Sequence, residues 1–148
     1  MQESLSKDYE SVEELELTNT ISAKILYGEL NSNLKEIEKK LGVKIHSRGS
    51  KLTILGERLQ TESAKYFINQ IYSLINKGYL LQPGDIEIAK RILDEKKSSL
   101  EEIFLDTVCI SVRKKIIAPK TINQKLYIDT IRNNDVVFGI GPAGTGKT

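Results

Sequence analysis

Residues 136–148 read VVFGIGPAGTGKT, an apolar run that passes directly into a glycine-rich loop. The last eight residues match G-x-x-x-x-G-K-[ST] at every fixed position and are Gly141, Pro142, Ala143, Gly144, Thr145, Gly146, Lys147 and Thr148. Glycines in such a loop allow positive φ and let backbone N–H groups curl around a phosphate. Lys147 would reach the β- and γ-phosphates, and Thr148 would present its hydroxyl to Mg²⁺. The stretch therefore predicts a site for ATP or a similar nucleotide together with Mg²⁺.

The apolar run before the loop predicts a strand over residues 136–140, because a phosphate loop of this kind follows a buried strand. Such a strand belongs at the centre of a parallel sheet and is apolar on both faces. Its neighbouring strands are not in the sequence. We therefore expect residues past about 112 to be less protected from hydrogen exchange than residues 20–76.

Gln124 lies about 17 residues before the glycine loop, at the start of a short predicted helix over residues 123–132. A glutamine amide offers an acceptor and two donors, which match the N6 donor and N7 acceptor of adenine. Gln124 is therefore a candidate adenine contact, and the alternative is an ordinary surface residue.

The sequence before residue 80 predicts a small two-layer α/β module. Alternating apolar residues indicate extended structure over 15–27, and apolar spacing of three and four indicates helices over 31–41 and 64–75. Between the helices, the apolar runs 43–46 and 52–55 flank Arg48-Gly49-Ser50 and predict a hairpin. Gly42 is the expected C-cap of the first helix.

Pro83-Gly84-Asp85 marks a boundary, and Asp85 is placed to cap a helix over 86–97. Residues 98–110 give no clear pattern, while 112–117 could form a strand. The predicted division is a disordered acidic lead-in (1–14), the α/β module (15–80), a linker with a helix (81–112) and the truncated start of a nucleotide-binding domain (113–148).

Composition narrows the setting, because 39% of the residues are hydrophobic, 28% are charged, and the net charge is +2. No apolar stretch approaches the roughly 20 residues that span a bilayer, and the acidic N-terminus is unlike a secretory signal. A single cysteine, Cys109, and a single histidine, His46, provide neither a disulfide nor a metal cluster. These features predict a cytoplasmic protein without a membrane partner. The basic stretches 24–51 and 113–125 either face phosphates or are ordinary solvated surfaces.

The run PKTINQKLYIDTIRNNDVVFGIGPAGTGKT, residues 119–148, resembles the PhoH-like (phosphate-starvation-inducible) P-loop ATPase family. The upstream run ILYGELNSNLKEIEKKLGVKIHSRGSKLTILGE, residues 25–57, resembles the N-terminal part of that family. The resemblance implies a RecA-like P-loop core, a cytoplasmic role in RNA metabolism and a parent protein that could be oligomeric. It assigns residues 141–148 to the ATP site and Gln124 to an adenine contact. The family's catalytic acids would follow Thr148, so this polypeptide is expected to hydrolyse ATP no faster than background.

The module also resembles a KH domain, in which a GXXG loop clamps a nucleic-acid backbone. The matching residues are Gly28-Glu29-Leu30-Asn31, which lack the second glycine and add an acid. Three interpretations stay open. The chain is the ATP-binding N-terminal part of a PhoH-like ATPase, an RNA-binding KH-like module with a vestigial nucleotide loop, or a truncated product without activity.

Overall fold

The computed structural model describes residues 10–95, 99–106, 109–110 and 116–144, and for residues 109, 110, 116 and 117 it describes the backbone alone. Strands β1 (Ser11–Glu16), β2 (Lys44–Arg48) and β3 (Lys51–Gly56) form an antiparallel sheet in the order β1-β3-β2. The register places Leu15 opposite Leu52, and Ile45 opposite Ile54. The predicted hairpin over 43–55 is confirmed.

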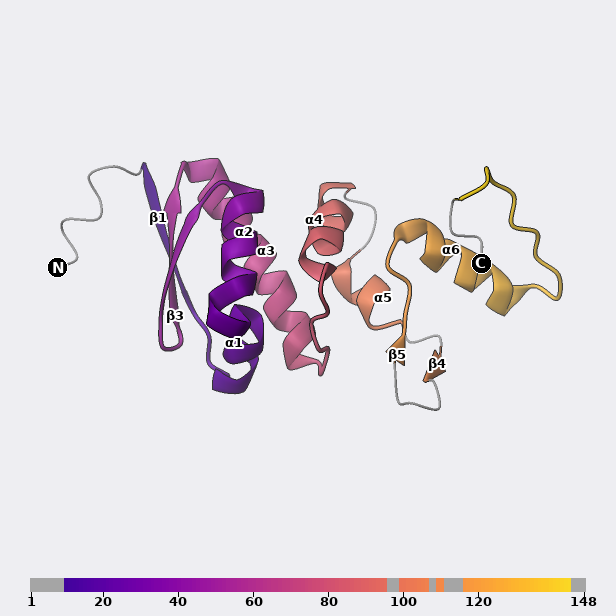
Figure 1. The fold of residues 1–148 in the computed structure, drawn as a ribbon, viewed down its shortest axis with the longest axis horizontal. Helices are drawn as coiled ribbons and strands as arrows, with labels where there is room; N and C mark the ends of the chain where they lie inside the picture. Colours follow the sequence, from indigo (N-terminus) through magenta and orange to yellow (C-terminus); the bar gives the residue numbers. More distant parts are fainter. Residues whose placement is uncertain (1–9, 96–98, 107–108, 111–115, 145–148) are drawn as a thin grey trace.

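Helices α1 (Thr20–Tyr27), α2 (Ser32–Leu41) and α3 (Arg58–Asn76) cover one face of this sheet (Figure 1). The buried side chains of α3 recur every three or four residues, which places them on one stripe; they are Thr61, Ala64, Phe67, Ile68, Ile71, Leu74 and Ile75. Gly42 ends α2 in the left-handed conformation, as predicted. Residues 11–76, called the α/β module below, confirm the predicted α/β class and its two layers.

Two predictions for the N-terminal part are wrong. Residues 20–27 form a helix instead of extended structure, because the side chain of Asn19 accepts hydrogen bonds from the N–H groups of Ile21 and Ser22 and so caps α1. The lead-in predicted for residues 1–14 is shorter, because β1 begins at Ser11 and pairs with β3. Residues 1–9 lie outside the described part of the chain.

The segment predicted as a linker is packed on the module. Helices α4 (Asp85–Glu95) and α5 (Leu100–Phe104) place their buried residues in the same hydrophobic cluster as α2 and α3. Ser99 and Glu102 form a capping box at the start of α5, which explains why a helix of five residues is stable there. The hydrophobic core therefore does not end near residue 80, where the sequence predicted a domain boundary, but includes residues as far as Phe104.

The remaining described elements lie at the end of the molecule remote from the three-stranded sheet (Figure 1). Strands β4 (Cys109–Ile110) and β5 (Ile116–Ile117) form a short antiparallel pair, and α6 (Ile122–Asn133) follows. The predicted helix over 123–132 is confirmed, whereas most of the strand predicted over 112–117 lies outside the described residues. Residues 116–144 are called the α6 segment below. No helix of the described residues is long and apolar enough to cross a membrane.

Candidate functional site

The glycine loop is described as far as Gly144, and its four described residues are exposed. Gly144 has a φ of 77°, and a Cβ added there would meet no atom within 4 Å. Left-handed φ and an open backbone are what a phosphate cradle requires of its glycines. Gly144 therefore meets this backbone requirement. Residues 145–148, with the predicted roles of Lys147 and Thr148, lie outside the described residues.

The strand predicted over residues 136–140 does not form. These residues have no strand assignment, and the side chains of Val136, Phe138 and Ile140 are exposed, Ile140 by 97%. A central strand is stabilised by the ladders on both sides and by layers above and below it. The described part of the chain supplies none of these, which explains why an apolar run remains in an extended coil next to α6.

Gln124 is exposed near the start of α6 and is held by local hydrogen bonds. Its backbone N–H donates to Oγ1 of Thr121 over 3.1 Å, so Thr121 is the N-cap of the helix. Its side-chain Oε1 accepts from the backbone N–H of Lys120 over 2.7 Å. The amide group of Gln124 therefore has a defined orientation, with Nε2 making no hydrogen bond to any described residue.

The side chain of Lys120 ends in a cage made by α4, by α5 and by the loop between α3 and α4. Its Nζ donates to Oδ1 of Asp85 over 2.7 Å and to the hydroxyl of Tyr79 over 2.9 Å. It also lies over the rings of Tyr79 and Phe104, at 5.6 and 5.3 Å from their centroids. Asp85, Tyr79 and Phe104 are called the Lys120 cage below.

Asp85 is the buried acid of this cage, with 1% of its side chain exposed. Its Oδ2 accepts from the Tyr79 hydroxyl over 2.7 Å and from the backbone N–H of Gln82 over 2.8 Å. Burial, followed by the hydrogen bond to Asp85, raises the pKa of Tyr79, which therefore stays a neutral donor. The sequence predicted that Asp85 caps a helix, whereas its carboxylate binds Tyr79, Gln82 and Lys120. The signal for this role was weak, since 35 residues separate Asp85 from Lys120.

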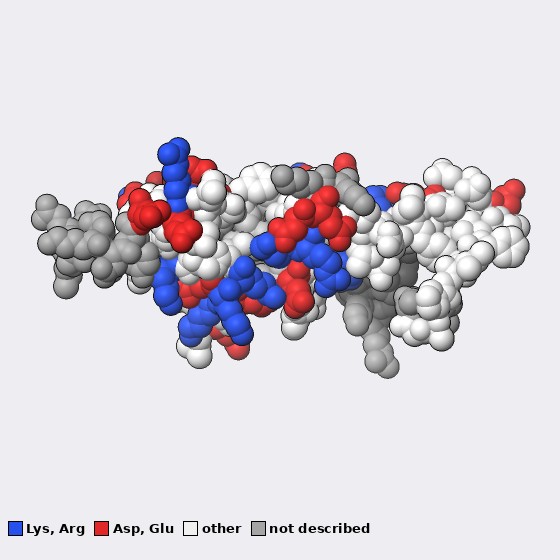
Figure 2. Space-filling view, turned by 90° about the horizontal axis from the view of Figure 1, so that it is seen from above, with Lys and Arg blue, Asp and Glu red and all other residues white. Residues whose placement is uncertain are grey.

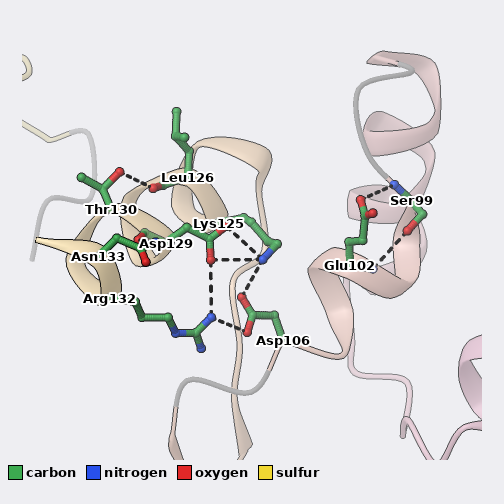
Figure 3. A network of polar contacts seen from close by, with 9 residues as sticks. All are labelled: Ser99, Glu102, Asp106, Lys125, Leu126, Asp129, Thr130, Arg132 and Asn133. Atoms are coloured by element: carbon green, nitrogen blue, oxygen red, sulfur yellow. Dashed lines mark hydrogen bonds and ion pairs between the residues drawn. The ribbon is translucent and has the colours of Figure 1, made fainter.

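A second polar network joins α6 to the loop after α5 (Figure 3). Asp106 accepts from Nζ of Lys125 over 3.1 Å and from the guanidinium of Arg132 over 2.8 Å, and both cations also contact Asp129. Partial desolvation raises the pKa of Asp106, but the hydrogen bonds from Arg132 and Lys125 outweigh it and lower that pKa. No residue of α6 is buried, and the helix is held by these ionic contacts, by the Lys120 cage and by the partly buried Ile122, which packs against the hydrophobic cluster.

Part of the basic stretch 24–51 lines an open hollow of about 480 Å³ between α2 and the start of β2. It is lined by Lys35, Glu38, Lys39, Gly42, Val43, Lys44 and Leu55. Figure 2 shows Lys and Arg side chains gathered along one side of the module, with Asp and Glu among them. Glu38 is turned inward, where its Oε1 accepts from the N–H of Ile45 over 2.7 Å. Lysines thus dominate the rim of this hollow.

The predicted GXXG-like loop connects α1 to α2, with Glu29–Asn31 in a 3₁₀ turn. Gly28, Leu30 and Asn31 all have positive φ, and Leu30 is 91% exposed. A Cβ at Gly28 would lie 2.7 Å from Oγ of Ser32, so this glycine is required. Asn31 occupies the position of the missing glycine and keeps a left-handed φ of 60°. The turn is therefore preserved although the second glycine is absent.

The remaining candidates have no site role that the structure supports. His46 is exposed on the edge strand β2, and the side chain of Cys109 is not described. Within the described ranges, no group of three or more His, Cys, Asp or Glu residues could hold a metal ion.

Comparison with known proteins gives one consistent family. The family model for PhoH-like protein matches residues 116–148. The chain is 38% identical to the PhoH-like protein of Mycobacterium tuberculosis (strain H37Rv) over 125 residues, which cover 83% of this chain and 35% of that protein. It is 34% identical to the PhoH-like protein of Bacillus subtilis over 135 residues, which cover 89% of this chain and 42% of that protein. It is 30% identical to the PhoH-like protein of Synechocystis, with 90% of this chain and 41% of that protein covered. The chain thus spans about two fifths or less of the length of these relatives. No solved structure matches it significantly.

Proposed function

Because this chain belongs to the PhoH-like protein family, which is a family of P-loop NTPases, we propose that it carries the phosphate loop and a base contact of an ATP site. The observation that carries the proposal is the full match of residues 141–148 to the phosphate-loop pattern inside the part of the chain that the family model matches. The open backbone at Gly144 supports it. ATP hydrolysis by a longer parent protein, with a link to RNA metabolism in the cytoplasm, is part of the same proposal.

Different residues would hold different parts of the nucleotide. Backbone N–H groups of Gly141 and of residues 143–146 would cradle the β-phosphate, since Pro142 has no N–H to donate. Lys147 would neutralise charge on the β- and γ-phosphates. Thr148 would hold Mg²⁺ through its hydroxyl, and the ion would help to neutralise the negative charge of the phosphates. Gln124 would contact adenine from α6. Turnover also needs a Mg²⁺-binding acid and a positioned water, so we expect this polypeptide to bind ATP without hydrolysing it above background.

Nucleotide binding is tested by titrating the 148-residue chain with MgATP in a calorimeter. Lys147→Ala should abolish or strongly weaken binding, whereas Lys90→Ala should not, since Lys90 pairs with Asp94 on the exposed face of α4. Binding that Lys147→Ala leaves intact would contradict the proposal. Phosphate release above that of the Lys147→Ala variant would contradict the expectation of binding without turnover.

RNA contact by the α/β module is a second candidate, favoured by the lysine-rimmed hollow beside α2. Helix α2, the hairpin of β2 and β3, and the long helix α3 follow in the order on which the KH resemblance rests. The left-handed Asn31 keeps the loop geometry, but Glu29 adds a negative charge beside the place where a phosphate would bind. We therefore propose weak RNA binding without sequence preference, driven by phosphate contacts.

RNA contact is tested by the salt dependence of binding to single-stranded RNA. The triple variant Lys35→Ala, Lys39→Ala, Lys44→Ala should lower both the affinity and the slope of log K against log salt, because fewer phosphates are neutralised. Lys40→Ala is the matched control, since Lys40 on the same helix already pairs with Glu87 over 3.4 Å. Tight, sequence-selective binding at physiological salt would show that the module, and not the nucleotide loop, is the principal functional site.

A further inference from the structure

Lys120 connects two parts of the molecule through two different groups. Its side-chain Nζ is bound in the Lys120 cage, where Asp85 accepts over 2.7 Å and two aromatic rings lie beneath it. Its backbone N–H donates to Oε1 of Gln124 over 2.7 Å. The preceding residue, Pro119, is buried and fixes φ at its own position. The orientation of the Gln124 amide therefore depends on a lysine that is anchored outside α6.

The hydrogen bond from Lys120 has a chemical consequence, because it decides which end of the amide is the acceptor. Oε1 is held as an acceptor with one lone pair still available, and Nε2 is left as the donor. Adenine offers a donor at N6 and an acceptor at N7, which match this arrangement. Guanine offers acceptors at both O6 and N7, so its O6 would face Oε1 and repel it. Rotation of the amide to suit guanine would break the bond to Lys120.

We propose that Lys120, anchored by Asp85 and Tyr79, is a positioning residue that makes the base contact of Gln124 selective for adenine over guanine. This inference rests on the proposed nucleotide site and adds to it the origin of its base selectivity. A buried carboxylate such as Asp85 needs a paired cation, so the anchor resists displacement. Through Lys120, the cage therefore connects α4 and α5 to Gln124, the residue of α6 that would contact the base.

The test compares the affinities of the full 148-residue chain for MgATP and MgGTP by calorimetry. The native chain should prefer ATP by roughly tenfold, the size expected for one good bidentate base contact. Lys120→Met keeps the stem on the aromatic rings but removes the ammonium, and should bring the ratio of the two affinities close to 1 by weakening ATP alone. Asp85→Asn should also lower the ratio of the ATP affinity to the GTP affinity. Lys120→Arg should keep part of the native preference for ATP, because it keeps a cation at this position. Gln124→Ala removes the base contact itself and should give the lowest ratio of the series.

Amide exchange gives a second readout that needs no nucleotide. The Lys120 N–H should exchange faster in Gln124→Ala and in Lys120→Met, while Lys90→Met leaves it unchanged. A role of Lys120 in folding alone would weaken ATP and GTP equally, so the ratio separates the two roles. A native ratio that Lys120→Met does not change, or a native ratio of 1, would overturn this inference and leave the nucleotide site standing. A chain that binds neither nucleotide would overturn the proposed function and the inference together.

Discussion

Ile71 in α3 is fully buried, whereas Ile131 in α6 is 48% exposed. The difference extends to their surroundings. The α/β module, with α4 and α5, shares one continuous hydrophobic cluster. Helix α6 has no buried residue and is held mainly by Lys120, Lys125 and Arg132, with Ile122 as its contact to the cluster. Salt screens exposed ion pairs but does not screen apolar burial. The two regions should therefore respond differently to the same perturbation.

The largest effect should come from the core. Ile71→Ala should lower the free energy of unfolding by about 3 kcal/mol, because it removes buried methyl groups and leaves a cavity. Ile131→Ala should change it by less than about 0.5 kcal/mol. Urea unfolding followed by circular dichroism measures both. Equal losses would show that α6 is part of the same cooperative core.

Gly28→Ala should come next, with a loss of about 2 kcal/mol, because it combines a positive φ with a Cβ 2.7 Å from Oγ of Ser32. Gly49→Ala is the matched control, since Gly49 has a φ of 63° and nothing within 4 Å. It should cost about 1 kcal/mol, from backbone strain alone. Thermal unfolding of the two variants separates the contribution of the contact from that of φ.

Removing a helix cap should have a smaller effect on stability, and the effect should differ between α1 and α6. Asn19→Ala removes the cap of α1, which packs on α3, and should lower global stability by about 1 kcal/mol. Thr121→Ala removes the cap of α6 and should leave global stability unchanged while increasing amide exchange at residues 122–125. If Thr121→Ala shifted the global transition as much as Asn19→Ala, the two regions would unfold as one unit.

The smallest effect should be acid loosening of α6. The pKa of Asp106 is lowered in the folded chain, so its stabilising contribution is present above its unfolded pKa of about 3.9 and is lost as pH falls through the lower folded value. NMR shifts of Lys125 and Arg132 in α6 should change below about pH 4, while those of the buried Ile68 and Ile71 in α3 do not. Asp106→Asn should remove this acid-dependent change. A change of the same size in the Asn variant would assign it to another carboxylate.

Sequence patterns predicted the elements whose apolar period is long and regular. The hairpin 43–55, residues 64–75 of α3 and helix α6 were predicted because their apolar spacing is clear. The start of α3, residues 58–63, was not predicted. Helix α1 was misassigned because the spacing of Ile21, Ala23 and Ile25 also fits a strand, and only the hydrogen bonds of Asn19 decide for a helix. The strand at 136–140 was predicted from its own apolar residues, but strand formation depends on partners that the described chain does not supply.

The candidate site divides in the same way. The phosphate loop was found because its chemistry depends on residues that are neighbours in sequence. The Lys120 cage could not be found, since Asp85, Tyr79 and Phe104 meet only after α3, α4 and α5 have packed. Gln124 was identified as a candidate from its position, but the hydrogen bond that orients its amide comes from a backbone group, which no side-chain pattern encodes.

Among the described residues, the buried members of the hydrophobic cluster all precede the α6 segment, of which Ile122 packs against them. During synthesis the ribosome releases the chain from its N-terminus, so every residue of this cluster emerges ahead of the glycine loop. The α/β module with α4 and α5 could therefore complete its packing on a nascent chain while residues 116–148 were still inside the exit tunnel. Lys120 would then bind to Asp85, Tyr79 and Phe104 after these residues had already packed. The glycine loop would follow a part of the chain that was already folded.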